Sequence, residues 1–455
     1  MMKIQSINPA TEQVNKEFET FTNQQIKEVC KISTAAFAKW KILPLKERTT
    51  LLKALASTLR SKKDEYAKLI TIEMGKPYKE SLAEIEKCAW TCEIYADNSE
   101  KWLKDEPVST EAKKSFVAFE PTGTVLAVMP WNFPFWQALR CAIPALTVGN
   151  TCILRHSNSV PMCAVAIEDA FKQAGFPEGV FKSVITDHSA VKRMINSRYI
   201  SGVSVTGSMG AGSEIAKVAA RKIKKCVLEL GGSDPFIVLE DADLQLAVQK
   251  AKEGRNLSSG QSCIAAKRFI VVKSVSDEFT QKLVALTKVV VVGDPMDSKT
   301  EIGPLANRQQ LEKLEAQVKD AQSNGAKVEC GGKRKTGKGY FYEATVITNV
   351  EKTMQVATDE VFGPVSPIII AKDEKDAIKI ANSTSFGLGA SIWTKDNEKG
   401  ERISRQIQAG LVYVNQIVRS DPRLPFGGVK ESGVGRELSR YGLLEFANIK
   451  SILIA

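Results

Sequence analysis

The sequence predicts an α/β protein in which helices cover both faces of parallel sheets. From residue 124 onward, short apolar runs alternate with amphipathic segments long enough for helices, for example strand 151–155, helix 162–174 and strand 180–185. Such alternation is typical of parallel sheets, and ligands bind these sheets beyond the carboxyl ends of the strands. A Gly-Gly-Ser-Asp-Pro run at 231–235 interrupts the series, and a second α/β series follows it. We therefore expect two α/β domains that meet near this run.

The individual elements follow from periodicity and turn residues. In the first series we expect strands at 124–129, 151–155, 180–185, 203–206 and 226–230, with helices at 135–148, 162–174, 189–196 and 212–220. In the second we expect strands at 236–239, 268–272, 365–371 and 390–394, with helices at 243–258, 277–288, 308–323, 374–382 and 398–408. An apolar strand at 449–455 ends the chain and should pair with another strand.

The first hundred residues read differently, because helical spacing dominates there. A capping box at Thr22-Asn23-Gln24-Gln25 opens the first helix. In the last of these helices, residues 78–102, the side chains of Ile85, Cys88, Cys92 and Tyr95 should face inward. We expect no chemical group in this region.

Composition limits the class of protein. The chain has 455 residues, 43% of them apolar and 25% charged, which is enough for more than one large core. No apolar run approaches the roughly 18 residues that a membrane span needs. The start of the chain is polar and has no apolar signal region, so we expect a cytoplasmic protein.

Charge and metal-binding residues exclude further classes. The net charge of +11 can attract phosphates or carboxylates, but the basic residues are scattered and do not indicate nucleic-acid binding. The run at 332–339 nearly matches a P-loop, yet it lacks the final Ser or Thr, so a basic surface turn is expected. Nine cysteines without a C-x-x-C pair favour a reducing compartment over disulfides or a zinc ribbon. With only His156 and His188, a three-histidine metal site is impossible, and we expect no metal.

Two strand ends offer groups for a nucleotide. The glycine-rich turn at 205–212 lies where a strand gives way to a helix, where backbone N–H groups can approach a phosphate. Its spacing is not G-x-G-x-x-G, and a turn without a ligand is an equal alternative. Arg155, His156, Ser157 and Asn158 close another strand and could bind a ribose or its phosphate, or form a solvated loop.

Three further residues are candidates for chemistry. Cys263 sits among small polar residues between a helix and a strand, although most cysteines are buried and inert. Asn132 lies between two prolines and three aromatic residues, where its amide could stabilise an oxyanion or satisfy nearby backbone. Glu229 ends an apolar strand and would be a general base of raised pKa if buried, or an exposed strand end.

Taken together, six runs resemble motifs of the aldehyde dehydrogenase superfamily and occur in the family's order along most of the chain. They are Pro130-Trp131-Asn132-Phe133-Pro134, Thr206-Gly207-Ser208, Leu228-Glu229-Leu230-Gly231-Gly232, Gly260-Gln261-Ser262-Cys263, Glu360-Val361-Phe362-Gly363-Pro364 and Pro425-Phe426-Gly427-Gly428. The short length and the runs 230–235 and 420–426 look most like the short succinate-semialdehyde dehydrogenases.

The resemblance implies a domain plan and an assembly. Residues 1–102 and 122–231 would form a parallel-sheet cofactor domain, and 232–428 an α/β catalytic domain. Residues 103–121 and 443–455 would form a small β extension for oligomerisation, in a homo-dimer or homo-tetramer. No nucleic-acid or membrane partner is implied.

The resemblance also implies catalytic roles. Cys263 would attack the aldehyde carbonyl, while Asn132 and the Cys263 backbone N–H would hold the oxyanion. Glu229 would activate the water that hydrolyses the thioester. The dinucleotide would be bound by a larger set: Trp131, Arg155, Ser157, Asn158, Gly207, Ser208, Gly212, Leu230, Glu360 and Phe362.

Two departures from the family pattern bear on cofactor choice. Arg155 stands where the family usually has a lysine, and Asn158 stands where many NAD-preferring members have a glutamate. A neutral Asn158 removes the repulsion of a 2′-phosphate, and Arg155 adds a partner for it. We therefore expect NADP to be accepted and preferred, with NAD also a possible cofactor.

For the substrate, the resemblance points to Arg140, eight residues after Asn132, as the group that binds a distal carboxylate. A second arginine of longer members is replaced by Leu257, which leaves Ser420 as the helper. This pair suits succinate semialdehyde but leaves glyceraldehyde or another short aldehyde open. Arg140 could instead form an ion pair within the protein and bind no substrate. For the chain as a whole, the alternative to an enzyme is a catalytically silent relative that only binds a nucleotide.

Overall fold

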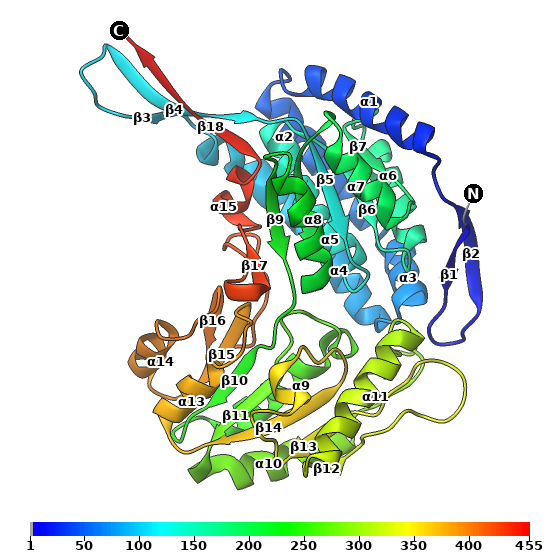
Figure 1. The fold of residues 1–455 in the computed structure, drawn as a ribbon, viewed down its shortest axis with the longest axis vertical. Coiled ribbons are helices and arrows are strands. Elements are labelled where there is room, and N and C mark those ends of the chain that lie inside the picture. Colours follow the sequence, from blue (N-terminus) through cyan, green and yellow to red (C-terminus); the bar gives the residue numbers. More distant parts are fainter. Residues whose placement is uncertain (1–2) are drawn as a thin grey trace.

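The computed structural model describes residues 3–455 and begins with a hairpin that the sequence did not predict (Figure 1). Strands β1 (Lys3–Ile7) and β2 (Val14–Glu19) pair antiparallel, and most of their side chains are exposed. Four helices follow: α1 (Asn23–Trp40), α2 (Leu45–Ser61), α3 (Lys63–Met74) and α4 (Tyr78–Trp102). The predicted capping box is present, because Thr22 and Gln25 satisfy each other's backbone N–H groups at the start of α1.

The first large sheet has the predicted parallel α/β build, with strand order β17-β9-β8-β5-β6-β7. Only β17 runs antiparallel, against β9. The bounds of the strands are β5 (Thr124–Met129), β6 (Thr151–His156), β7 (Phe181–Ser183), β8 (Ile200–Thr206), β9 (Lys225–Glu229) and β17 (Gly433–Val434). The helices of this part are α5 (Pro134–Val148), α6 (Pro161–Gln173), α7 (His188–Asn196) and α8 (Met209–Ala220).

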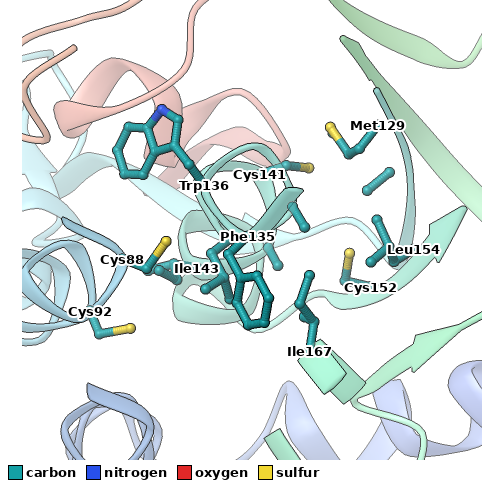
Figure 2. Close-up of a cluster of buried hydrophobic side chains, with 14 of the residues drawn as sticks. Cys88, Cys92, Met129, Phe135, Trp136, Cys141, Ile143, Cys152, Leu154 and Ile167 are labelled. Carbon is teal, nitrogen blue, oxygen red and sulfur yellow. The ribbon is translucent and has the colours of Figure 1, made fainter. Parts of the chain in front are cut away.

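Helix α5 forms the centre of this part, and all of its 15 residues are buried. It packs against β5 and β6 and against α4. Figure 2 shows Phe135 and Ile143 of α5 close to Cys88 and Cys92 of α4, in an apolar cluster that also contains Cys152. A helix buried all round stays in place only if its neighbours are rigid, so α4 is well situated to control the start of α5.

The second sheet has the order β12-β13-β14-β11-β10-β15-β16, and only the β12–β13 pair is antiparallel. Its strands are β10 (Pro235–Val238), β11 (Arg268–Val272), β12 (Lys327–Cys330), β13 (Thr345–Thr348), β14 (Val365–Ala371), β15 (Gly389–Trp393) and β16 (Leu411–Val414). Its helices are α9 (Leu244–Asn256), η1 (Leu257–Gly260), α10 (Lys273–Lys288), α11 (Arg308–Ser323), α12 (Gln355–Thr358), α13 (Glu374–Ala381) and α14 (Asn397–Ser404).

The chain passes from the first sheet to the second between β9 and β10, at the predicted Gly-Gly-Ser-Asp-Pro run. It returns near its end, because η2 (Lys430–Ser432) leads into β17, and Gly433 pairs with Glu229 at the end of β9. Two distant segments therefore meet at this strand end.

A small antiparallel extension projects from the body of the molecule (Figure 1). Strand β18 (Ala447–Ile454) pairs along its whole length with β4 (Lys114–Pro121), and β3 (Glu106–Pro107) lies on the other side of β4; α15 (Ser439–Leu444) precedes β18. This confirms the expected pairing of the terminal strand. Within residues 3–455, no helix combines the length and the apolarity that crossing a bilayer requires.

Candidate active site

The loop that carries Cys263 has an unusual backbone. The helix predicted to reach residue 258 ends instead at Asn256, and Ser258 and Ser259 adopt left-handed φ values of 55° and 57°. Gly260 has φ 75°, and a Cβ there would lie 2.3 Å from the carbonyl oxygen of Gly363. Such conformations persist only where the surroundings fix them, so this loop is held in one shape by its neighbours.

Lys267 is one of these neighbours, and the sequence did not point to it. Its buried ammonium donates to the carbonyl oxygens of Ser262, at 2.9 Å, and of Cys263, at 2.5 Å. The only sequence signal is a lysine beside the start of a strand expected to be buried. It fixes the loop and also places a positive charge near the thiol of Cys263.

Cys263 itself is partly exposed, whereas six of the nine cysteines are buried. Burial nevertheless raises the pKa of its thiol to about 11, against the opposing effects of Arg140 and Lys267. The thiolate is the nucleophilic form, so this raised pKa favours the less reactive thiol of Cys263 in the protein alone.

Asn132, in the loop between β5 and α5, contacts the same cysteine loop. Its Nδ2 donates to the carbonyl oxygen of Gln261 at 2.9 Å, and its Oδ1 accepts from Nε2 of Gln137 at 2.9 Å. These two bonds orient the amide so that its N–H groups face the cysteine loop, and the second Nδ2 hydrogen is left for a ligand. Gln137 was not predicted, although it lies only five residues beyond Asn132.

Glu229 is buried at the end of β9, and neither of its carboxyl oxygens has a hydrogen-bond partner within residues 3–455. Burial, and then the charge of Glu437, raise the pKa of Glu229 well above its ordinary value, while Arg140 opposes the shift. A raised pKa makes the ionised carboxylate a stronger base for a water that reaches it.

A pocket beside these residues is lined by segments from both sheets. It is lined by eight of the predicted residues: Trp131, Asn132, Gly207, Ser208, Leu230, Cys263, Glu360 and Phe362. The rings of Trp131 and Phe362 meet edge to face with centroids 6.0 Å apart. Oε1 of Glu360 accepts from the backbone N–H of Gly232 at 3.0 Å, which fixes this carboxylate at the pocket wall. Gln137, Gln310 and Lys313 also line the pocket and were missed.

The N-terminus of α8 faces open space in a manner that suits a phosphate. Ser208 caps the helix by accepting from the N–H of Ala211, and a Cβ at Gly207 or Gly210 would meet no atom within 4 Å. Gly212 has a different surrounding, because a Cβ there would lie 2.4 Å from the side chain of Leu230. Gly212 therefore allows the close approach of α8 to the strand end.

The carboxyl end of β6 and the turn that follows it form a cationic site. The guanidinium of Arg155 donates to the carbonyl oxygen of Thr186, at 3.2 Å, and to Oδ1 of Asn158, at 3.3 Å. Its Nε is buried and has no hydrogen-bond partner within the described chain, and burial lowers its pKa. Ser157 lies in the same turn. An unpaired buried donor on a cation is a feature that a bound phosphate would satisfy.

Comparison with known proteins identifies the same family as the residues of the site. The model of the aldehyde dehydrogenase family matches residues 2–452. The chain belongs to the aldehyde dehydrogenase family. It is 45% identical over 454 residues, covering 100% of both chains, to a Synechocystis sp. protein named probable succinate-semialdehyde dehydrogenase (NADP+). It is 43% identical over 457 residues, again covering 100% of both chains, to succinate-semialdehyde dehydrogenase (NADP+) 1 of Mycobacterium tuberculosis.

Solved structures agree with this assignment. The crystal structure of succinic semialdehyde dehydrogenase from Streptococcus pyogenes in complex with NADP+ superposes with a TM-score of 0.97 at 35% identity and covers 99% of both chains. The predicted resemblance and fold class of this aldehyde dehydrogenase are therefore confirmed.

The first hundred residues of this aldehyde dehydrogenase do bind the loops of the candidate site, although the contacts are to backbone and not to reactive groups. Glu84 of α4 accepts from the backbone N–H groups of Phe135, at 2.9 Å, and Trp136, at 3.0 Å, and so caps the start of α5. Glu80, one turn earlier, accepts from the N–H of Ser258 at 2.6 Å. Two carboxylates of one helix face thus bind the backbone of both loops that carry the catalytic candidates.

The two predicted substrate residues have partners of their own. Arg140 is buried, forms an ion pair with Glu437, donates to Oγ1 of Thr206 at 3.3 Å and lies 4.4 Å from the ring centroid of Phe426. It does not line the pocket, and an ion pair is the alternative that the sequence left open for it. Ser420 is buried and accepts from Nζ of Lys87 at 2.5 Å.

Proposed function

We propose that this protein oxidises succinate semialdehyde to succinate with NADP+ through a covalent thioester on Cys263. The observation that carries the chemistry is the contact of Asn132 with the cysteine loop, which places an amide donor where an oxyanion would form beside the sulfur. The full-length similarity to relatives named as succinate-semialdehyde dehydrogenases supports the choice of substrate.

The residues present fit an NADP cofactor. Glu360 and the rings of Trp131 and Phe362 would hold the nicotinamide end, the start of α8 the pyrophosphate, and Arg155 with Ser157 and Asn158 the adenine ribose and its 2′-phosphate. When bound, NADP+ supplies a hydride acceptor and a positive charge near the thiol. That charge would favour the thiolate, whose pKa is about 11 without it.

Each step of the proposed reaction uses a different residue of the chain. The sulfur of Cys263 adds to the aldehyde carbon, and the oxygen that becomes negative accepts hydrogen bonds from Asn132 and from the Cys263 backbone. Loss of hydride leaves a thioester. Glu229 takes a proton from water, the resulting hydroxide adds to the thioester carbon, and the thiolate leaves with the carboxylic acid released.

An aldehyde panel tests this function. We expect succinate semialdehyde with NADP+ to give the highest kcat/KM, read as absorbance of NADPH, with butanal and glyceraldehyde as competitors. Preference for glyceraldehyde or another short aldehyde would replace the substrate. A protein that binds NADP+ but produces no NADPH with any aldehyde would be the catalytically silent relative. Cys263→Ser should bind NADP+ and turn nothing over.

Cofactor choice has its own test at Asn158. Asn158→Glu places a carboxylate beside the expected 2′-phosphate, and like charges at close range cost several kcal/mol. The NADP/NAD ratio of kcat/KM should fall roughly tenfold or more, whereas Asn158→Gln should leave it nearly unchanged. An unaltered ratio in Asn158→Glu would remove this residue from cofactor selection.

We also propose that the protein is a homo-dimer or homo-tetramer. Strand β18 is an edge strand, and Ile449 and Leu453 on it are 61% exposed. Exposed apolar side chains on an unpaired edge favour association with another chain. Light scattering of the purified protein measures the mass; a monomer at micromolar concentration would contradict the proposal.

A further inference from the structure

Gln137 of α5 is a buried amide that binds the side chain of Asn132. It is 2% exposed, it lines the pocket that holds Cys263, and its Nε2 donates to Oδ1 of Asn132 at 2.9 Å. Its own Oε1 is buried and has no hydrogen-bond partner within residues 3–455. A buried acceptor without a partner destabilises a fold, and an apolar side chain of similar size would avoid that cost. Packing alone therefore does not explain a glutamine at this position.

The bond from Gln137 determines which end of the Asn132 amide faces the cysteine loop. A side-chain amide has a donor end and an acceptor end, and half a turn exchanges the two. As observed, Nδ2 of Asn132 donates to the carbonyl oxygen of Gln261 at 2.9 Å while Oδ1 accepts from Gln137. After half a turn, Oδ1 would face the carbonyl oxygen of Gln261, and Nδ2 would face the donor of Gln137. The observed direction therefore keeps an N–H group on the side where an oxyanion would form.

Both neighbours of Asn132 are anchored. Gln137 stands in the first turn of α5, where Glu84 accepts from two backbone N–H groups. On the other side, Oε1 of Gln261 accepts from the backbone N–H of Ala306 at 2.9 Å. The amide of Asn132 is thus held between two fixed segments, and Gln137 supplies the contact on the α5 side.

We propose that Gln137 is a positioning residue that speeds the addition of Cys263 to the aldehyde by holding the Asn132 amide in its observed direction. This inference rests on the proposed function, in which Asn132 binds the oxyanion. A displacement of a participating group by about 1 Å can lower a rate by about 100-fold, so the loss of one orienting bond should be measurable. Because every aldehyde forms the same oxyanion, the effect should not depend on the rest of the substrate.

A double-mutant cycle tests the inference. Gln137→Met nearly keeps the size of the side chain and removes its donor, so the rate of the first turnover, read as NADPH in stopped flow, should fall by roughly 10- to 100-fold. Asn132→Ala should lower that rate by roughly 10²- to 10³-fold. The double variant should be no slower than Asn132→Ala, because Gln137 acts through Asn132. Two losses that multiply would show that Gln137 acts by another route and would overturn the inference.

Two aldehydes distinguish positioning from a direct contact with the substrate. Gln137 lines the pocket, and a direct contact would make its loss larger for one aldehyde than for another. In Gln137→Met, the first-turnover rates for succinate semialdehyde and butanal should fall by factors that agree within about twofold, with the KM for NADP+ unchanged. A loss confined to one aldehyde would make Gln137 a substrate-binding residue and contradict the positioning role.

Two further variants control for damage to the fold. Thr147→Val removes a buried hydrogen bond at the far end of α5, from Oγ1 to the carbonyl oxygen of Ile143 at 2.7 Å, and should keep the wild-type rate. A loss in Thr147→Val equal to that in Gln137→Met would show that any weakening of α5 slows the reaction, against a specific role of Gln137. Gln137→Asn keeps a polar side chain but draws the amide back by one carbon, so it should be slow as well. A Gln137→Asn variant with the wild-type rate would overturn the inference.

The outcomes also separate this inference from the function on which it rests. A wild type that reduces NADP+ with aldehydes, together with a Gln137→Met variant at the full first-turnover rate, removes the positioning role and leaves the proposed function standing. A wild type that produces no NADPH with any aldehyde overturns both.

Discussion

The motif loops and the buried face of α4 contribute to the site in different ways. The motif loops, residues 130–137 and 257–263 with the end of β9, present groups that can take part in the reaction. The α4 row, which we define as Glu80, Glu84 and Lys87, presents charged groups at helical spacing, and two of them bind backbone of the motif loops. Candidate reactive groups thus lie on two loops and a strand end, and a regular helix holds the two loops in place.

This difference shows that a charged residue near an active site can serve to hold a loop in place by accepting hydrogen bonds from its backbone N–H groups. Glu84 satisfies two N–H groups at the start of α5, which would otherwise be buried without partners. Glu80 binds the N–H of Ser258, one of two left-handed serines before Cys263. Changes in the motif loops should therefore alter chemistry at constant stability, whereas changes in α4 should alter stability or the shape of the loops.

Glu229→Gln should have the largest effect, and it should be purely chemical. Without a base for the hydrolytic water, kcat should fall by roughly 10²- to 10⁴-fold. The first turnover should survive, so a burst of NADPH should precede the slow steady state in stopped-flow absorbance. Stability should be retained, because Glu229 has no hydrogen-bond partner to lose. Glu240→Gln, which changes an exposed carboxylate just after β10, is the matched control. Loss of the burst would show that Glu229 acts before the thioester forms.

The sequence predicts the parts of this molecule whose signals are local. Alternating apolar runs indicated both parallel sheets, and Thr22 with Gln25 indicated the start of α1 because a capping box is contained in four residues. Strand β17, only two residues long, and the largely exposed hairpin β1–β2 have no such apolar signal. Their existence depends on pairing with other segments.

In the candidate site, too, residues within local motifs were predicted and residues that act through long-range contacts were not. Family motifs identified Cys263, Asn132 and Glu229, whereas Lys267, Glu437 and the α4 row were missed. The bond between Glu80 and Ser258 joins residues 178 positions apart, and helical periodicity cannot reveal such a contact. Charged residues beside an apolar helix face can be solvated or buried, and only packing decides between the two.

Lys76→Met should have the next largest effect, and it should act on stability. The side chains of Lys76 and Glu84 are 0% and 1% exposed and form a buried ion pair. Removing one partner leaves a buried carboxylate without its counter-charge, which typically costs about 3–5 kcal/mol. Denaturant unfolding should show this loss, while Lys79→Met, an exposed position in the first turn of α4, should change little. Equal stabilities of the two variants would mean that the pair does not anchor α5.

Glu80→Gln should have the smallest effect, visible in the pH dependence of stability. Burial raises the pKa of Glu80 to about 7, although the N–H of Ser258 and the charges of Lys76 and Lys79 act against the shift. The folded protein therefore keeps a proton that the unfolded chain releases near pH 4.5. The stability that this group contributes is complete below the unfolded pKa and is lost as pH rises through about 7.

Because the side chain is partly exposed, we expect a loss of only about 1–2 kcal/mol between pH 5 and pH 8. Glu80→Gln should keep the acceptor for Ser258 and lack this slope, so its free energy of unfolding should fall less over that interval than that of the wild type. Parallel curves for the two proteins would mean that Glu80 is already ionised at pH 5, and that α4 binds the cysteine loop through a full negative charge.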